Sequence, residues 1–366
     1  MINNVYNFII ERKIEILVVH GLFNTIHTHR FIHEAVYEAF SYIIDYYSLD
    51  IKLIWCEDDE FSYNLYNYDK NYLVFSSPHY NTDAFLPVLD NVYYILHYRT
   101  HNKITNKLIT KYNDLLLNRK AVKYVEYRGG PNKNFDKKNV RYLSNGFFWY
   151  YNYIPEEDDI YDLDIKEKEN YTYFYQPTNE LHMCWATNIF PEDINKNIEL
   201  VKKGIEYNKQ SYFCGTIWNT NKKEVDKWKL LCIQNRLNCI FERENDEEEH
   251  QKKVRESLIS PAFQGSSQRE SDKWFYIPCR ILKNISYGSL GITNNPGVRR
   301  FFKDYHIIYH EDIEKLFYKS LEYSEIIKNH SEEFIDKMIK VMEFVRDNHT
   351  YLNRIDDLVY YGFDLK

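Results

Sequence analysis

The chain has 366 residues, with 47 Lys and Arg against 54 Asp and Glu, which gives a formal net charge of −7. This acidic balance excludes a general binder of nucleic acid backbones, because such proteins need a basic face. Hydrophobic residues make up 44% of the chain, which excludes a largely disordered protein. The length predicts about two domains.

The composition is rich in aromatic residues, with 35 Tyr and 22 Phe against 11 Gly and 9 Pro. The favoured residues have A/T-rich codons, so the A/T-rich genome of a large DNA virus or a microbe would account for this bias. A surface that stacks on carbohydrates or nucleobases is the alternative explanation, and composition does not decide between the two.

The sequence carries no sign of a membrane span or of export. No stretch approaches about 18 uncharged apolar residues, and residues 1–13 lack the order of a secretory signal. The six cysteines are scattered without a CxxC pair, which predicts reduced core thiols and no zinc site. We therefore expect a cytoplasmic protein, which would lie in the host cytoplasm if its origin is viral.

The N-terminal half alternates short apolar runs with amphipathic segments. Helices are expected at 28–44, where the apolar spacing is close to 3.6, and at 103–117. Strands are expected at 14–19, 51–56, 72–76, 92–96 and 122–127. Buried strands that alternate with helices predict a parallel sheet of the α/β class.

The C-terminal half repeats this alternation. Strands are expected at 182–187, 211–217, 238–242, 258–263, 290–293 and 306–309. Helices are expected at 191–208, 222–236, 246–257, 278–287 and 298–302, and from 313 to the end, the last around 344–359. The predicted division is an N-terminal domain over 1–190, a second domain over 191–343 and a C-terminal helical segment over 344–366.

Ligands of open parallel sheets bind beyond the carboxyl ends of the strands. In this chain, the rule selects His20-Gly21 in the first half, and 215–219, 264–268 and 276–291 in the second half. The last of these segments is the most informative. Pro278 suits the first turn of a helix, and Arg280 and Lys283 share one face of it. Such a helix start could hold a diphosphate, and an amphipathic helix with two solvated cations is the alternative.

Three segments together resemble the GT-B glycosyltransferases, in particular family 1-like and CgeB-like chains. They are 280–293, where Arg, apolar and small residues precede Gly288 and a strand; 212–218, which is similar to the opening of a donor domain; and 349–354, with the pattern HTY..R. The resemblance covers about 211–358. It implies two Rossmann-like domains that face a cleft, with a C-terminal helix crossing back to the first domain.

The resemblance also implies the activity, which is transfer of a sugar from a UDP- or GDP-linked donor to an acceptor hydroxyl of a glycan or glycoconjugate. No cofactor and no obligatory metal are implied. The first domain would bind the acceptor and the second the nucleotide sugar. The donor contacts that it implies are Gly215, Thr216, Gln264, Arg280, Lys283, Asn284 and Ser286. Lys283 departs from the Glu that binds ribose in many retaining members, so the anomeric outcome stays open. A phosphate contact is the alternative role for Lys283.

His20 is the candidate general base if the reaction inverts the anomeric centre, since an imidazole accepts protons near neutral pH. A partly buried histidine that packs beside Gly21 is the alternative. His97 closes the strand at 92–96 and is a candidate for acceptor recognition. His29 and His33 have the i, i+4 spacing of metal ligands, but no Glu completes the zincin pattern, so exposed helix residues are the simpler interpretation.

Other chemistries find less support in the sequence. Asp162-Leu163-Asp164 has the DxD form that GT-A enzymes use to hold a metal, and a solvated acidic loop is the alternative. The sequence contains no GxxxxGK[ST], GxGxxG or GxSxG motif, which disfavours kinases, nicotinamide dehydrogenases and α/β-hydrolases. Two other classes stay open: a non-catalytic carbohydrate-binding or scaffold protein on the same fold, and an epimerase of GT-B type.

Overall fold

The computed structural model describes residues 3–21, 29–57, 69–76, 88–98, 113–126, 140–142, 173–175, 179–215, 217, 221–242, 246–264, 277–302, 305–329 and 331–363. Its strands are β1 Ile14–Gly21, β2 Lys52–Glu57, β3 Asn71–Ser76, β4 Val92–Tyr98, β5 Ala121–Glu126, β6 Val140–Tyr142, β7 Tyr173–Tyr175, β8 Glu180–Met183, β9 Asn208–Tyr212, β10 Asn238–Ile240, β11 Ser257–Ile259, β12 Ile292–Thr293 and β13 Ile308–Tyr309. Its helices are α1 Asn3–Glu11, α2 His29–Tyr47, α4 Asn113–Leu117, α6 Pro191–Lys203, α7 Lys222–Gln234, α8 Glu247–Glu256, α9 Cys279–Ser286, α10 Val298–Phe301, α11 Ile313–Lys328, α12 Glu332–Asn348 and α13 Tyr351–Gly362.

The larger sheet has the strand order β2-β1-β3-β4-β5-β8-β7-β6. Its strands from β2 to β8 in this order pair in parallel, and β7 and β6 continue the sheet in antiparallel fashion. The predicted α/β class with a parallel sheet is therefore confirmed, and the order 2-1-3-4-5 of its first five strands is that of doubly wound folds.

Helices cover both faces of this sheet. Alternate residues of the strands, such as Val19 and Phe75, pack on one face against α1, α2 and α13. Residues one position earlier, such as Val18 and Val74, pack on the other face, where Leu115 of α4 lies. Because successive side chains of a strand point to opposite faces, the inner strands β1, β3 and β4 are buried on both sides, which explains their nearly continuous apolar runs.

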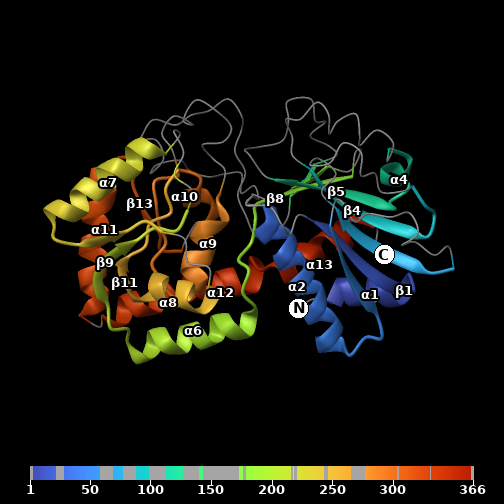
Figure 1. Cartoon of the computed structure of the whole chain (residues 1–366), viewed down its shortest axis with the longest axis horizontal. Helices are drawn as coiled ribbons and strands as arrows, with labels where there is room; N and C mark the ends of the chain where they lie inside the picture. The colour runs from blue at the N-terminus through green and yellow to red at the C-terminus, as the bar shows by residue number, and fades with distance from the viewer. Residues whose placement is uncertain are drawn as a thin grey trace.

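The second half forms a smaller set of parallel strands. A three-stranded sheet has the order β10-β9-β11, and β12 pairs with β13. A bridge between Pro261 and Ile292 joins the two, so the order β10-β9-β11-β12-β13 repeats the 2-1-3-4-5 pattern. Core residues of α6, α9 and α12 cover one face, and those of α7 and α11 cover the other. In Figure 1 this region lies on the left and the larger sheet on the right.

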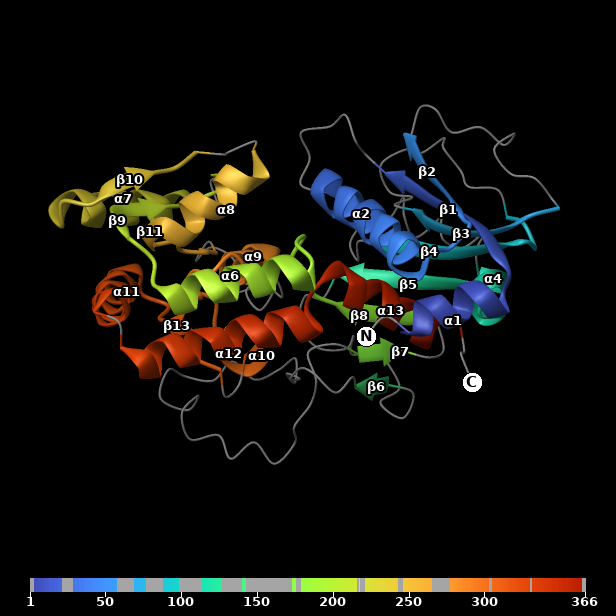
Figure 2. The same cartoon turned by 90° about the horizontal axis from the view of Figure 1, so that it is seen from below.

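The chain crosses between these regions twice. The first crossing follows β8, at residues 184–190. The second lies between α12, which runs beside α6, and α13, which packs on α1 and α2 of the other region (Figure 2). A bridge between Thr187 and Thr350 ties the two crossings together. Helix α13 comes close to β5, since a Cβ at Gly362 would overlap Val122.

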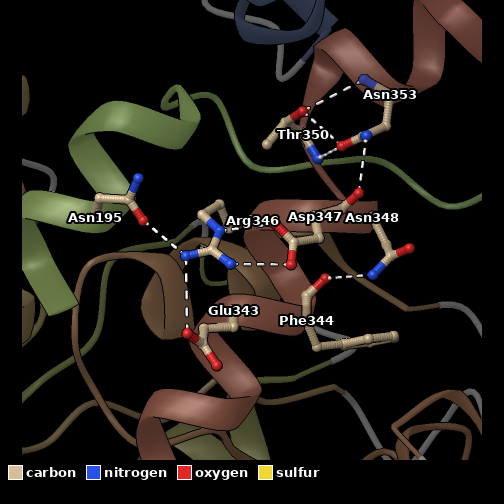
Figure 3. A network of polar contacts seen from close by, with 8 residues as sticks. All are labelled: Asn195, Glu343, Phe344, Arg346, Asp347, Asn348, Thr350 and Asn353. Atoms are coloured by element: carbon tan, nitrogen blue, oxygen red, sulfur yellow. Dashed lines mark hydrogen bonds and ion pairs between the residues drawn. The ribbon is translucent and has the colours of Figure 1, made fainter. Parts of the chain in front are cut away.

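Residues 349–354 build the second crossing. The Thr350 hydroxyl accepts a hydrogen bond from the Asn353 amide and starts α13 in a capping box (Figure 3). The buried Arg354 guanidinium donates to the carbonyl oxygens of Cys184 and Asn348, each at 2.9 Å. Arg354 therefore joins both crossings, and in this chain the HTY..R pattern has a structural role.

The crossing has a second polar anchor on the α12 side. Arg346 donates to Asn195 of α6 at 2.8 Å and to Asp347 at 2.7 Å (Figure 3). The contact with Asn195 joins the last turn of α12 to α6, just before the helix ends at Asn348. None of the described helices is long and apolar enough to span a membrane.

Several predicted elements were wrong in extent. The strands expected at 182–187 and 258–263 lie at Glu180–Met183 and Ser257–Ile259. The helix expected at 191–208 ends at Lys203, because Gly204 adopts φ +90° and its amide bonds to the Val201 carbonyl. The strand expected at 211–217 lies at Asn208–Tyr212 instead. The helix expected around 344–359 is interrupted at His349, where α12 ends and α13 is capped anew. Helix α1, which the sequence did not predict, buries Val5, Phe8 and Ile9.

Candidate functional site

The side chain of Arg280, on α9, lies beyond the carboxyl end of β9 in the second set of strands. Its guanidinium carbon is 4.5 Å from the centre of the Phe213 ring, which directly follows β9. A Cβ at Gly215 would overlap the same guanidinium, so the glycine leaves the space that the cation fills. Phe213 and Gly215 therefore form a seat, meaning the surface on which the Arg280 guanidinium packs. This seat lies at the switch point between β9 and β11, where the strand order reverses and where ligands of such sheets bind.

The helix that carries Arg280 forms as the sequence predicts. Pro278 is the N-cap of α9, and Gly288, with φ +94°, follows its C-terminus. Ile281, Leu282 and Ile285 are buried in the core. Arg280 and Lys283 share the opposite, half-exposed side of the helix. The apolar face fixes the rotation of α9, and this rotation directs both cations away from the core.

Asn294 holds the loops after β11 and β12 together. Its side-chain amide accepts from the Gln264 backbone N–H at 2.7 Å and donates to the Gln264 carbonyl at 2.7 Å. The Thr293 hydroxyl adds a hydrogen bond to the Ala262 carbonyl at 2.7 Å. Gln264, a predicted donor contact, is therefore held in place at the carboxyl edge. We did not predict Asn294, although its position directly after a strand is a usable signal.

Two other predicted donor contacts have their polar groups engaged in packing. The Asn284 side chain donates to the Ser260 carbonyl at 2.8 Å, and the Ser286 hydroxyl lies 2.7 Å from the Thr187 hydroxyl. Both residues are buried, on the side of α9 that faces away from the solvent. Asn284 is thus tied to the segment after β11, and Ser286 is tied to the first crossing and to α6, whose Asn197 donates to the Ser286 carbonyl at 3.1 Å. Thr216 lies outside the described residues.

Lys283 faces charged residues of both regions. The pKa of the Glu38 carboxyl on α2 is raised by desolvation and by the charges of Glu34 and Glu247, whereas the Lys283 ammonium opposes the rise. Helix α2 belongs to the first region and Glu247 to the second. Carboxylates of the two regions thus influence each other electrostatically at Glu38, and the positive charge of Lys283 partly offsets their repulsion.

The carboxyl edge of the first sheet carries a histidine and a serine. His20 on β1 and Ser76 on β3 are paired in register, and His20 Nδ1 lies 3.2 Å from the Ser76 hydroxyl. Both are buried, with His20 2% exposed. Burial lowers the pKa of His20 to about 4, so its imidazole is neutral at neutral pH. The pair lies at the switch point between β1 and β3.

A second histidine pair lies on the opposite face of the sheet. His33 Nε2 of α2 is 3.5 Å from His97 Nδ1 of β4, and both side chains are fully buried. The ring of His97 packs against Trp185 and Tyr124. The prediction of an exposed His33 was therefore wrong, because α2 turns this residue toward the sheet.

The remaining metal candidates are only partly described. Within the described residues, no group of three or more His, Cys, Asp and Glu side chains is placed to hold a metal ion. The side chain of His29 is outside the described part, as are Asp162 and Asp164 and the acidic run 156–159. The possible DxD metal site therefore stays a prediction.

Comparison with known proteins does not assign this chain to a family. No protein-family model matches the chain, and no curated protein matches it. The candidate site is therefore the basis for assigning a function. It combines a positioned guanidinium at one carboxyl edge, which suits a phosphate or carboxylate, with a neutral imidazole at the other, which suits proton transfer.

Proposed function

We propose that the chain transfers a glycosyl group from a nucleoside-diphosphate sugar to an acceptor hydroxyl, on a GT-B arrangement of two Rossmann-like domains. The domains would span 1–190 and 191–343, with 344–366 returning to the first. The observation that carries the proposal is the Arg280 guanidinium, seated on Phe213 and Gly215 at the carboxyl end of β9. The repeated 2-1-3-4-5 strand order and the packing of α13 on α1 support it.

The chemical step needs charge stabilisation on the leaving nucleotide. As the bond between the sugar and the diphosphate breaks, negative charge grows on the diphosphate, and a guanidinium held in place stabilises it without rearranging. Arg280 and the α9 N-terminus would take this role, with Lys283 one helical turn further on. Asn284 and Ser286 are omitted from the proposed donor contacts because their polar groups are engaged elsewhere.

The acceptor hydroxyl must lose a proton if the reaction inverts the anomeric centre. Neutral His20 would accept it, and Ser76 would orient the imidazole through Nδ1. Because the pKa of His20 is lowered to about 4, the imidazole stays unprotonated throughout the neutral range. His20 is only 2% exposed, so an acceptor would have to displace neighbouring groups to reach the imidazole. Acceptor binding would therefore be coupled to exposure of the base.

The first experiment measures nucleotide binding. We expect UDP or GDP to raise the melting temperature of the protein, and Arg280→Ala to weaken that binding by about 10- to 100-fold, since a hydrogen bond to a charged group contributes roughly 1.5 to 3 kcal/mol. Arg346→Ala is the matched control, because it removes an arginine that bonds α12 to α6, at the crossing. Titration calorimetry of both folded variants gives the affinities.

The outcomes separate the open functions. Unchanged nucleotide affinity in folded Arg280→Ala would refute the assignment of Arg280. No stabilisation by any nucleotide or nucleotide sugar would favour a carbohydrate-binding or scaffold protein. A donor that is altered without an acceptor would indicate an epimerase, whereas free nucleotide released only with an acceptor indicates transfer.

A further inference from the structure

Two of the six cysteines contact each other through their side chains. Cys232 lies in the last turns of α7, and Cys239 lies on β10, and their thiols share a hydrogen bond. The sequence predicted six unrelated core thiols, because the pair is not spaced as CxxC. Cys232 is fully buried, whereas Cys239 is only partly buried. One member of the pair is therefore open to reagents and the other is in contact with it from inside.

A tight turn brings the two residues together. After α7 ends at Gln234, Arg236 adopts a positive φ of 55°, and the Leu237 amide bonds to the Cys232 carbonyl at 2.9 Å. The chain then enters β10, where Cys239 pairs in register with Ser211 of β9. The pair is thus held by backbone contacts on both sides, and thiol contact needs no rearrangement of the fold.

The local charges make the outer thiol the reactive one. The pKa of the Cys239 thiol is lowered chiefly by the hydrogen bond from Cys232, and the nearby Lys229 ammonium lowers it further, although burial opposes this. The Lys229 ammonium lies over the ring of Phe241, two residues after Cys239, at 4.7 Å from the ring centre. The same hydrogen bond and burial raise the pKa of Cys232. Deprotonation is therefore favoured at Cys239 over Cys232, and the thiolate is the form that reacts with peroxides.

We propose that Cys239 and Cys232 form a redox-active dithiol that a peroxide converts into a disulfide. This inference is independent of glycosyl transfer. The Cys239 thiolate attacks one peroxide oxygen: an S–O bond forms, the O–O bond breaks, and the leaving oxygen takes up a proton from water. The Cys232 sulfur then attacks the Cys239 sulfenic acid: the S–S bond forms, the S–O bond breaks, and the leaving hydroxide takes the Cys232 proton as water. The peroxide gains the two electrons that the thiols lose.

The other four thiols differ in exposure: Cys214 and Cys279 are partly buried, as Cys239 is, whereas Cys184 and Cys56 are buried. Cys184 is fully buried beside the Arg354 guanidinium, and desolvation raises its pKa. Cys56 is buried in the core of the first sheet. These residues serve as internal references, because peroxide should reach them more slowly than Cys239.

The experiment treats the folded full-length protein with hydrogen peroxide, blocks the remaining thiols and digests with trypsin. Cleavage after Arg236 separates the peptide 230–236, which holds Cys232, from the peptide 237–243, which holds Cys239. We expect a cross-linked pair of these peptides that a thiol reductant separates, and loss of two of the six titratable thiols. Thiol loss without this cross-linked pair would overturn the proposal.

Variants test the order of the two steps. In Cys232→Ser, Cys239 should stop as a sulfenic acid that a 1,3-dione reagent labels, and no cross-linked peptide should form. In Cys239→Ser, Cys232 should stay reduced, because it is buried. Cys56→Ser is the matched control and should oxidise like the unmodified chain. Labelling of Cys56 or Cys184 as fast as Cys239 would contradict the assigned reactivity, and the peptide map of the unmodified chain stays decisive if a variant does not fold.

Discussion

The carboxyl edges of the two strand sets share a topology and differ in chemistry. Each set has the order 2-1-3-4-5, so each has a switch point beside its first strand. At the first, His20 and Ser76 are buried and uncharged. At the second, a half-exposed Arg280 lies on Phe213 beside Gly215. The same backbone plan thus presents a proton acceptor on one side and a fixed cation on the other.

The difference arises from what covers each edge. His20 alternates with Val19 along β1 and points to the face that also buries Val18, so desolvation dominates its behaviour. Arg280 projects from the polar side of α9 and keeps solvent contact. Burial suits a group that works in its neutral form, whereas a guanidinium needs solvent or an anion because it cannot lose its charge.

The largest expected effect concerns the buried histidine and pH. The pKa of His20 falls from 6.5 to about 4 on folding, so the unfolded chain binds more protons between these values. His20 therefore does not reduce the free energy of unfolding above pH 6.5. As the pH falls from 6.5 toward 4, His20 alone should lower this free energy by about 3 kcal/mol.

Urea unfolding of the unmodified chain and of His20→Asn, at neutral pH and at about pH 4.5, measures this contribution. The variant should lose less stability than the unmodified chain over this range. The pKa values of His306 and His349 are also lowered, chiefly by burial, so part of the pH dependence should remain in the variant. Equal slopes for both proteins would contradict the neutral, buried state of His20.

The second prediction concerns Asn294, whose side chain clamps the Gln264 backbone at the carboxyl edge of the second strand set. Asn294→Ala removes two buried hydrogen bonds to the Gln264 backbone and should lower the free energy of unfolding by about 2 kcal/mol. Asn294→Asp retains an acceptor for the Gln264 amide but loses the donor, so an intermediate loss is expected. Urea denaturation gives both values, and a loss below about 0.5 kcal/mol in Asn294→Ala would show that the loops do not depend on the clamp.

The smallest effect tests the seat of the cation. A Cβ in Gly215→Ala would overlap the Arg280 guanidinium, and the glycine does not have a positive φ, so the substitution should move the cation without straining the backbone. We expect nucleotide affinity to fall about tenfold, or 1.4 kcal/mol.

A double-mutant cycle gives this prediction its control. If Gly215 acts through Arg280, the substitution should have little further effect in an Arg280→Ala background. Additive losses of affinity in the double variant would mean that Gly215 contacts the nucleotide itself, and calorimetric titration distinguishes the two results.

Local sequence was sufficient where neighbours in the chain decide the structure. The α9 helix shows this, since Pro278, the apolar spacing and Gly288 fix its ends and its buried face. The strand from Ile14 was predicted from a β-branched run for the same reason. The prediction failed at Gly204, whose positive φ ends α6 five residues early, a signal that we did not weigh.

The sequence by itself determined the α/β class, most of the elements and the placement of Arg280 and Lys283 on one helix face, because these follow from periods of two and 3.6 residues. The tertiary structure alone decided which polar groups stay available. Ser286 meets Thr187 from 99 residues away, and Arg354 binds the Cys184 carbonyl from 170 residues away. Hydrogen bonds over such separations leave no periodic signal, because they depend on how packed elements meet in space.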